Sequence, residues 1–202
     1  PMPDCRFDAE KHLYFIDGVN VPSFSEIAEA NGLFNYSAVS EEIMEASGQF
    51  GSAAHKACQL WDLEQLDEES LSAPLIPYLD GWKKFRSEFG VVIYPQWIET
   101  PMFSSKYRFG TTPDRIVSIG NKMTVLEIKT TTTIQKAIAV QTAAQKLAFE
   151  ENYGSIKQRL AVQLVGEGKY KIHEYKKLSD EAVFKSAVNV YYFKKENGLW
   201  KA

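Results

Sequence analysis

The sequence has 202 residues, of which 45% are hydrophobic and 24% are charged, and its formal net charge is −3. This composition is typical of a single globular domain, excludes fibrous and disordered classes, and leaves no apolar run long enough to span a membrane. A net acidic chain is not a generic polyanion binder, so contact with a nucleic acid would need a local patch.

The two cysteines, Cys5 and Cys58, are far apart in the sequence and form no C-x-x-C pair. Two thiolates are too few for a zinc ribbon or an iron–sulfur cluster. The first residues also lack the basic and apolar segments of a secretory signal. We therefore expect a cytoplasmic protein with reduced cysteines.

The N-terminal residues predict a β-hairpin and then a short helix. Asp17-Gly18 separates two alternating segments, which is a strong hairpin signal. Ser23 and Glu26 form a capping box at the start of the helix, and Asn31-Gly32 supplies its C-terminal stop.

Two longer helices are predicted next. The first covers about residues 40–65, with Gly48 and Gly51 as candidate breaks. The second covers about residues 72–90, where large apolar residues recur at helical spacing and Gly90 supplies the stop.

Residues 91–202 predict strands that alternate with helices. Strands are expected within 91–103 and 106–110, a hairpin about Gly120-Asn121, a helix over 133–154, a second hairpin over 158–175 and a last helix over about 179–195. This order favours an α/β fold with a mixed central sheet flanked by helices. We expect one domain over 1–202, in which the hairpin and helices of 1–90 precede a core of 91–202.

The first of these hairpins brings two acids together. A two-residue turn pairs Ile119 with Lys122, and the same register pairs Asp114 with Glu127. Carboxylates on cross-strand neighbours about 5 Å apart repel by roughly 3 kcal/mol at an effective dielectric constant of about 20. A nearby cation is therefore expected.

Strand alternation puts Lys129 on the same face as Val125 and Glu127, opposite to Leu126 and Ile128. Two oxygen ligands beside an amine suit Mg²⁺ and its chemistry on phosphates. Lys129 could orient or deprotonate a water molecule, or stabilise charge on the phosphate. From spacing alone, the alternative is a pair of solvated edge acids bound to Lys129.

Two short segments resemble the PD-(D/E)XK nuclease signature: TPD, which ends at Asp114, and EIK, which begins at Glu127 after a gap of twelve residues. The order of other motifs resembles the RecB-type and phage exonuclease branch, which includes lambda exonuclease. GSAAH ends at His55, and Glu99 precedes the strand of Asp114. The likeness covers roughly residues 20–175.

A helical Q-x-x-x-Y motif of that branch is best matched by QKLAF, from Gln145 to Phe149. Phe149 stands where the branch has Tyr, and Gln141, one turn earlier, is a second candidate for the Gln. Thr111 stands where many members have Gly. From the sequence alone, the two glutamines could equally be core amides bonded to the backbone, and His55 and Glu99 ordinary core or surface residues.

The resemblance implies a restriction-endonuclease-like core and hydrolysis of phosphodiester bonds with Mg²⁺, for which Mn²⁺ substitutes. It implies that Lys129 and Gln145 take part in catalysis with the two acids. The implied metal ligands are His55, Asp114, Glu127 and the main-chain carbonyl of Ile128, with Glu99 as an additional acid.

Candidate nucleic-acid contacts are hydroxyls, amides and basic residues around the proposed site. The threonines at 130–133 precede a helix N-terminus, where hydroxyls could donate to phosphate oxygens. The predicted contacts are Ser52, Arg108, Thr130 and Gln141, and further basic residues near the site are Lys106, Arg115, Lys136 and Lys146.

The function expected from the sequence is a DNA exonuclease of phage or bacterial recombination type, acting in the bacterial or phage-infected cytoplasm without a membrane partner. A homo-oligomer and a recombination partner protein are both open. Two alternatives are a structure-specific endonuclease and a non-cleaving DNA-binding or regulatory protein on the same fold. The second is favoured by the net acidity and by Phe149.

Overall fold

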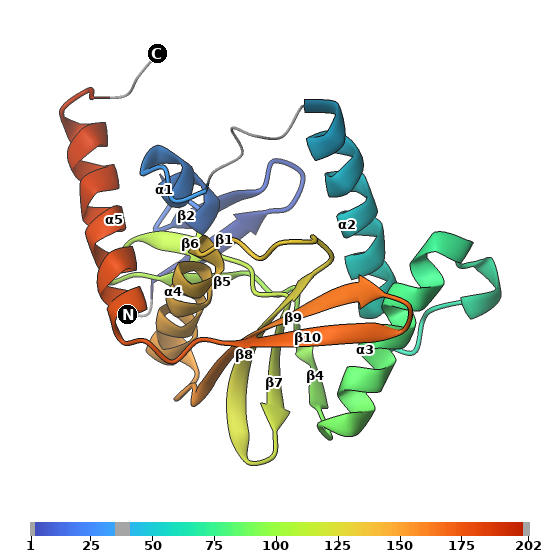
Figure 1. Cartoon of the computed structure of the whole chain (residues 1–202). Coiled ribbons are helices and arrows are strands. Elements are labelled where there is room, and N and C mark those ends of the chain that lie inside the picture. Colours follow the sequence, from blue (N-terminus) through green and yellow to red (C-terminus); the bar gives the residue numbers. More distant parts are fainter. Residues whose placement is uncertain (1–2, 35–40, 200–202) are drawn as a thin grey trace.

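The computed structural model describes residues 3–34 and 41–199 (Figure 1). The N-terminal part contains β1 (Cys5–Asp8), β2 (Leu13–Ile16), β3 (Val19–Val21), α1 (Phe24–Ala30), α2 (Glu41–Asp62) and α3 (Ile76–Glu88). The remainder contains β4 (Val92–Ile98), β5 (Met102–Ser104), β6 (Phe109–Thr111), β7 (Arg115–Ile119), β8 (Lys122–Lys129), α4 (Ala137–Asn152), β9 (Gln158–Gly166), β10 (Lys169–Glu174) and α5 (Ser179–Glu196). In this part of the chain, no helix has the length and apolar character that crossing a membrane requires.

The central sheet has five strands in the order β10-β9-β8-β7-β4. Strands β8 and β9 are parallel, and the other neighbours are antiparallel. Helix α4 makes the crossover between the two parallel strands, as a parallel connection requires. The predicted α/β class with a mixed, helix-flanked sheet is confirmed.

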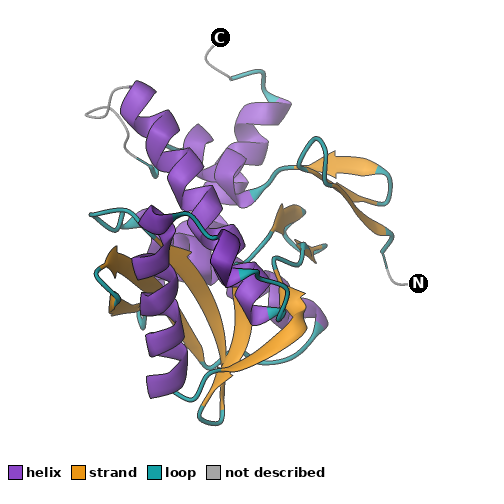
Figure 2. Ribbon diagram, turned by 90° about the vertical axis from the view of Figure 1, so that its right-hand side faces the viewer, coloured by secondary structure: helices purple, strands orange, loops and turns teal. Residues whose placement is uncertain are grey.

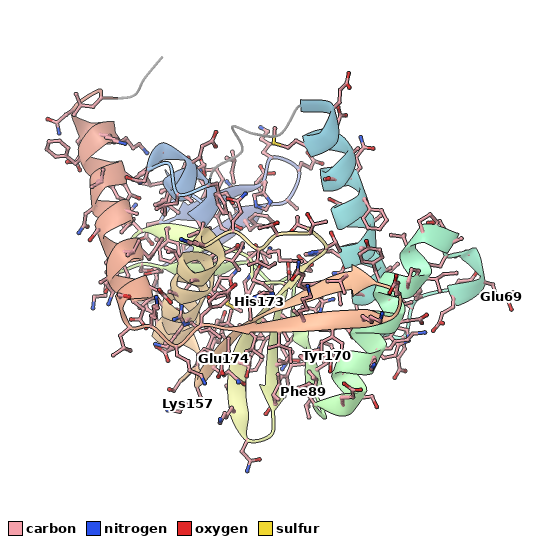
Figure 3. All side chains as sticks on the ribbon, in the orientation of Figure 1. Glu69, Phe89, Lys157, Tyr170, His173 and Glu174 are labelled. Carbon is pink, nitrogen blue, oxygen red and sulfur yellow. The ribbon has the colours of Figure 1, made fainter. Side chains whose placement is uncertain are left out.

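Each face of this sheet is covered by its own helices (Figure 1). Helices α1, α4 and α5 pack on one face with Val125, whereas α2 and α3 pack on the other with Leu126 and Ile128. The alternation predicted for β8 is therefore confirmed. On the outer edge, Tyr170 of β10 packs its ring against Phe89 at the end of α3 (Figure 3).

The N-terminal strands form a separate three-stranded sheet that lies to one side of the central one (Figure 2). Its predicted hairpin is confirmed, and β1 is an additional strand that pairs with β2. Tyr14 of this sheet covers Gly110 so closely that a Cβ at Gly110 would lie 2.0 Å from its ring. Glycine there allows the N-terminal sheet to pack on β6.

The hairpin that carries the acids has the predicted register, with Ile119 opposite Lys122 and Arg115 opposite Leu126. Gly120 has a φ of 58°, the left-handed value that a tight hairpin turn requires. The ladder ends at Arg115, so Asp114 lies just beyond the last pair, at the level of Glu127.

Other element boundaries differ from expectation. Helix α2 is continuous through Gly48 and Gly51, while its predicted start at residue 40 lies outside the described residues. Helix α4 begins at Ala137 rather than at 133, because the preceding threonines form a loop. Gln163 of β9 donates to the carbonyls of Thr131 and Thr132 at 2.7 and 3.0 Å and holds that loop in place.

Candidate active site

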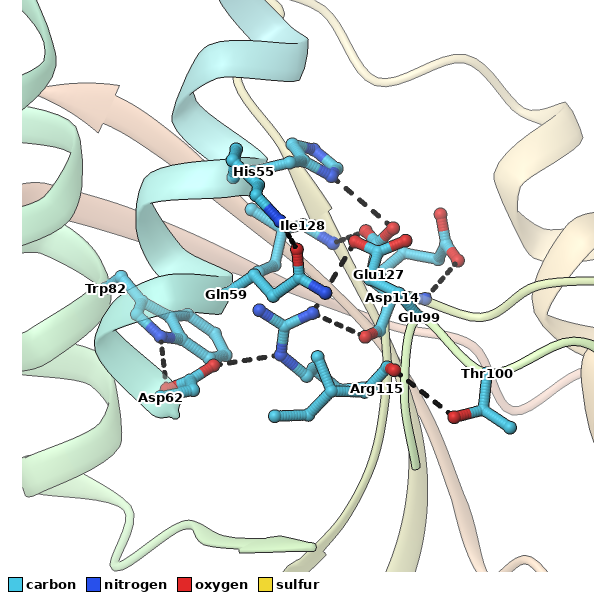
Figure 4. Close-up of polar contacts among 12 residues, drawn as sticks. His55, Gln59, Asp62, Trp82, Glu99, Thr100, Asp114, Arg115, Glu127 and Ile128 are labelled. Carbon is cyan, nitrogen blue, oxygen red and sulfur yellow. Dashed lines mark hydrogen bonds and ion pairs between the residues drawn. The ribbon is translucent and has the colours of Figure 1, made fainter. Parts of the chain in front are cut away.

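The candidate site lies where β7 begins and β8 ends, and residues in or next to three other elements contribute to it. Asp114 precedes β7, while Glu127 and Lys129 belong to β8. His55 comes from the middle of α2, and Glu99 directly follows β4 (Figure 4). Helix α4 adds its two glutamines from the opposite side.

Glu127 is fully enclosed by donors. Its Oε2 accepts from Lys129 Nζ at 2.6 Å and from Gln141 Nε2 at 3.1 Å. Its Oε1 accepts from Gln145 Nε2 at 2.7 Å and from the main-chain N–H of Asp114 at 3.4 Å. An ionised carboxylate offers about four acceptor positions, so the protein already uses all of those of Glu127.

Both glutamines thus donate to Glu127, because they lie one turn apart on the same face of α4. Gln145 is fully buried, and no described residue donates to its Oε1. The interpretation of the pair as core amides bonded to the backbone is wrong, because both side chains donate to a carboxylate instead.

Asp114 is held by the backbone and faces a histidine. Its Oδ2 accepts from the N–H of Ile128 at 2.6 Å, and its Oδ1 lies 3.4 Å from His55 Nδ1. Burial alone would raise the pKa of Asp114, but His55, Lys129 and this N–H outweigh it and keep the pKa well below its ordinary range. Asp114 is therefore ionised at neutral pH.

A lysine and a histidine accompany the acids. Burial alone would lower the pKa of Lys129, but the charges of Glu127 and Asp114 raise it well above its ordinary range. Burial likewise opposes a charge on His55, yet the Asp114 carboxylate raises the pKa of His55 above its usual value. Lys129 thus carries a positive charge at neutral pH.

Glu99 reaches the site through an irregular edge of the sheet. Strand β4 pairs with β7 through a register shift between Ile93 and Ile98, and Pro95 in this interval cannot donate to a ladder. Glu99 then has a φ of 49°, which is uncommon for a residue other than glycine. Its own N–H donates to the carbonyl of Asp114 at 3.1 Å.

His55, Glu99 and Asp114 each present a ligand atom, and the three atoms lie within 4.8 Å of one another. Two carboxylate oxygens and an imidazole nitrogen suit a divalent ion such as Mn²⁺ or Mg²⁺. Glu127 is not a member of this group. Ile128 contacts the site through its N–H, which donates to Asp114. The ligand role predicted for its carbonyl stays a prediction.

A cleft of about 1330 Å³ opens beside these residues. One wall is formed by α2, with Phe50, Ser52 and His55, and the other by Lys129 and the threonine loop 130–133. Gly51 brings the walls close together, since a Cβ at Gly51 would lie 3.4 Å from Thr130 Oγ1. The cleft therefore has a hydroxyl-rich wall that faces a helix.

The structure separates the residues that were considered for nucleic-acid contact. Ser52 and Thr130 line the cleft. Gln141 instead binds Glu127, and Arg108 is not among the residues that line the cleft. Arg115, expected near phosphates, is fully buried, because its strand face packs against α2 and α3.

Asp62 was not predicted to belong to this region, although it accepts a hydrogen bond from Arg115 at 2.9 Å. A sequence signal for it existed. Alternation puts Arg115 on an apolar sheet face, and a buried guanidinium needs an acidic partner.

No protein-family model matches the sequence, and no curated protein is similar to it in sequence. Among solved structures, an alkaline exonuclease from Laribacter hongkongensis has 13% sequence identity and a TM-score of 0.49, over 87% of this chain and 88% of that one. A "Putative exonuclease" from Eubacterium rectale has 10% identity and a TM-score of 0.46, over 89% of this chain and 76% of that one. At these scores the similarity carries no argument about function, which has to be inferred from the site itself.

Proposed function

We propose that this protein is a metal-dependent DNA nuclease that hydrolyses phosphodiester bonds, with its whole length forming one nuclease domain. One observation carries the proposal: Asp114, Glu127 and Lys129 gather with His55 and Glu99 beside an open cleft. Three of these residues belong to the PD-(D/E)XK-like hairpin, and two come from elements distant in sequence. Such a gathering is unlike a pair of solvated edge acids.

The donor set fits a hard divalent ion, Mg²⁺ or Mn²⁺. His55, Glu99 and Asp114 would hold it. The sequence resemblance also implies Glu127 and the carbonyl of Ile128 as ligands, and Glu127 would then have to exchange one of its present donors for the ion. When bound, the ion would polarise the phosphate and lower the pKa of the attacking water.

The side chains of the chain have separate roles in this proposal. Lys129 stays charged next to the cleft, so it would stabilise negative charge on the phosphate and on the departing oxygen rather than act as a base. Gln141 and Gln145 fix the orientation of the Glu127 carboxylate. Ser52 and Thr130 would donate to phosphate oxygens along the cleft.

Action on DNA ends, as an exonuclease of phage or bacterial recombination, is the finer proposal and rests on the motif order in the sequence. A homo-oligomer or a recombination protein would then be its partner. Linear, circular and branched DNA should be cut at different rates. Circular duplex should resist an exonuclease, whereas a structure-specific endonuclease would cut the branched substrate first.

The test is a cleavage assay on 5′- and 3′-labelled linear duplex with Mg²⁺ or Mn²⁺, with EDTA as a blank. We expect Lys129→Ala to lower the rate by about 10²- to 10³-fold, as for loss of a group that stabilises transition-state charge. Lys169→Ala is the matched control, because Lys169 is an exposed lysine that pairs with Glu167 outside the cleft. Equal rates for wild type and Lys129→Ala would exclude the role given to Lys129.

A non-cleaving DNA-binding protein is the second candidate, and Phe149 favours it. Phe149 lacks the hydroxyl of the related motif, and it is buried against Trp97 and Tyr153 at ring distances of 5.1 and 5.3 Å. Salt-dependent DNA binding without cleavage in Mg²⁺, Mn²⁺ or Ca²⁺ would support this candidate over the nuclease.

A further inference from the structure

Asp62 is the last residue of α2, and its side chain is fully buried although the proposed chemistry does not use it. Its Oδ1 accepts from Trp82 Nε1 at 3.0 Å, and its Oδ2 accepts from Arg115 Nε at 2.9 Å (Figure 4). Its Oδ1 also accepts from Arg86 Nη1 at 2.6 Å. One carboxylate therefore joins α2, α3 and β7.

Arg115 carries this connection into the candidate site. Its Nη1 donates to the main-chain carbonyl of Asp114 at 2.5 Å and lies 3.6 Å from Glu99 Oε1. The same carbonyl also accepts from the N–H of Glu99. The guanidinium thus touches the backbone of one candidate ion ligand and the side chain of another.

Helix α2 is fixed to the start of β7 at two points. His55 and Asp62 are seven residues apart, which is close to two helical turns, so both lie on the same face of α2. His55 meets Asp114, and Asp62 meets the next residue, Arg115. Between them, Cys58 is fully buried in the core that α2 shares with α3.

We propose that the Asp62–Arg115 ion pair is a positioning device for the ion site. It docks α2 on β7 and thereby sets the distances among the His55, Glu99 and Asp114 ligand atoms. Neither Asp62 nor Arg115 would touch the substrate. The inference rests on the proposed function only in requiring that these three residues bind a divalent ion.

A geometric role explains the Asp62–Arg115 pair better than a purely stabilising one. A buried ion pair is often no more stabilising than well-packed apolar residues of similar volume, so stability alone is a weak reason for it. Partners behind the ligands of a metal site orient them, and losing such a partner typically weakens metal binding 10- to 100-fold. Arg115 is such a partner for Glu99 and Asp114.

In the experiment, Mn²⁺ is titrated into metal-free protein without DNA. Calorimetry and electron paramagnetic resonance each measure the Kd for Mn²⁺. Asp62→Asn keeps the size of the side chain and can still accept from Trp82, but it loses the charge that holds Arg115. We expect the Kd for Mn²⁺ to rise about tenfold or more.

The chain offers a matched control in its second buried Arg–Asp pair. Arg159 Nη2 donates to Asp180 Oδ2 at 2.7 Å, and both side chains are nearly buried. The hydrogen bonds of Arg159 go to Asp180, Thr142 and two main-chain carbonyls, and none goes to a site carboxylate. Asp180→Asn should therefore lower stability while the Kd for Mn²⁺ stays within about twofold of wild type.

Equal Mn²⁺ affinity in wild type and Asp62→Asn would overturn the inference, and so would equal weakening in Asp62→Asn and Asp180→Asn. If Asp62→Asn does not fold, Arg115→Lys makes the same comparison, because one ammonium cannot reproduce the forked contacts of the guanidinium. A wild type that binds no Mn²⁺ would overturn the ion site and this inference together. A wild type that binds Mn²⁺ without cutting DNA would remove the nuclease proposal and leave the positioning role testable by the same affinities.

Discussion

The two halves of the candidate site treat their carboxylates differently. In the closed half, made of Glu127, Lys129, Gln141 and Gln145, the acid accepts from three side chains and one main-chain N–H. In the open half, made of His55, Glu99 and Asp114, the Glu99 side chain is 33% exposed and forms an ion pair with Arg115 at 3.6 Å.

This difference indicates a division of labour between the halves. A carboxylate whose acceptor positions are filled by the protein contributes mainly to a fixed geometry and to holding a charged lysine. Carboxylates that converge on one point with fewer donors leave lone pairs for a ligand. The closed half should therefore matter most for stability, and the open half for ion binding.

The largest expected effect is the loss of the closed-half acid. Glu127→Ala leaves a largely buried ammonium and two amides without their acceptor, so the free energy of unfolding should fall by about 3–5 kcal/mol. Urea denaturation at pH 7 in EDTA measures it. Glu99→Ala, the matched change in the open half, should cost less than about 1 kcal/mol. Equal losses would show that the halves do not differ in this way.

The next effect is stabilisation by the ion. At an Mn²⁺ concentration about 100 times its Kd, wild type should gain about 2.7 kcal/mol in unfolding free energy. Asp114→Asn should lose this gain, because it removes the central charge of the open half. Denaturation with and without Mn²⁺ measures it.

Gln141→Leu is the control for that measurement, since it alters the closed half and leaves the three open-half ligands unchanged. It should keep most of the gain from Mn²⁺. If Gln141→Leu loses as much of the gain as Asp114→Asn, the ion depends on both halves equally, and the division between them is wrong.

The closed half was largely predictable from the sequence, because local rules determine it. A two-residue turn and strand alternation sufficed to bring Glu127 and Lys129 together and to put Asp114 of the open half beside them. Helical spacing put Gln141 and Gln145 on one stripe. These rules act over short stretches of chain, whereas the contacts of Gln141 and Gln145 with Glu127 depend on how α4 packs on the sheet, and the sequence left them open.

The open half was less predictable, because it depends on tertiary contacts. The position of Glu99 follows from the irregular pairing of the edge strand β4 and from the left-handed backbone conformation of Glu99 itself. No sequence pattern predicted either feature. The Asp62–Arg115 contact joins residues 53 positions apart. Arg115 was named among the basic residues near the site that could contact phosphates, although the alternation rule already put it on the apolar face.

The smallest expected effect concerns the protonation of Glu99. Burial and the Asp114 charge raise the pKa of Glu99 from its ordinary 4.5 to about 7. Between these values the folded chain binds more protons than the unfolded chain, so this group favours folding at low pH and the benefit is lost as pH rises through about 7. Glu99→Gln should remove this dependence.

In EDTA, thermal melts of wild type and Glu99→Gln should therefore separate as the pH rises from 4.5 to 8, with the variant gaining about 2 °C relative to wild type. Added Mn²⁺ should reverse the order at pH 8, because the ion binds the ionised carboxylate that the variant lacks. If the melting temperatures of the two proteins in EDTA differ by the same amount at every pH, Glu99 titrates like a solvated acid. The open half would then lack the crowded charge that makes a cation its natural ligand.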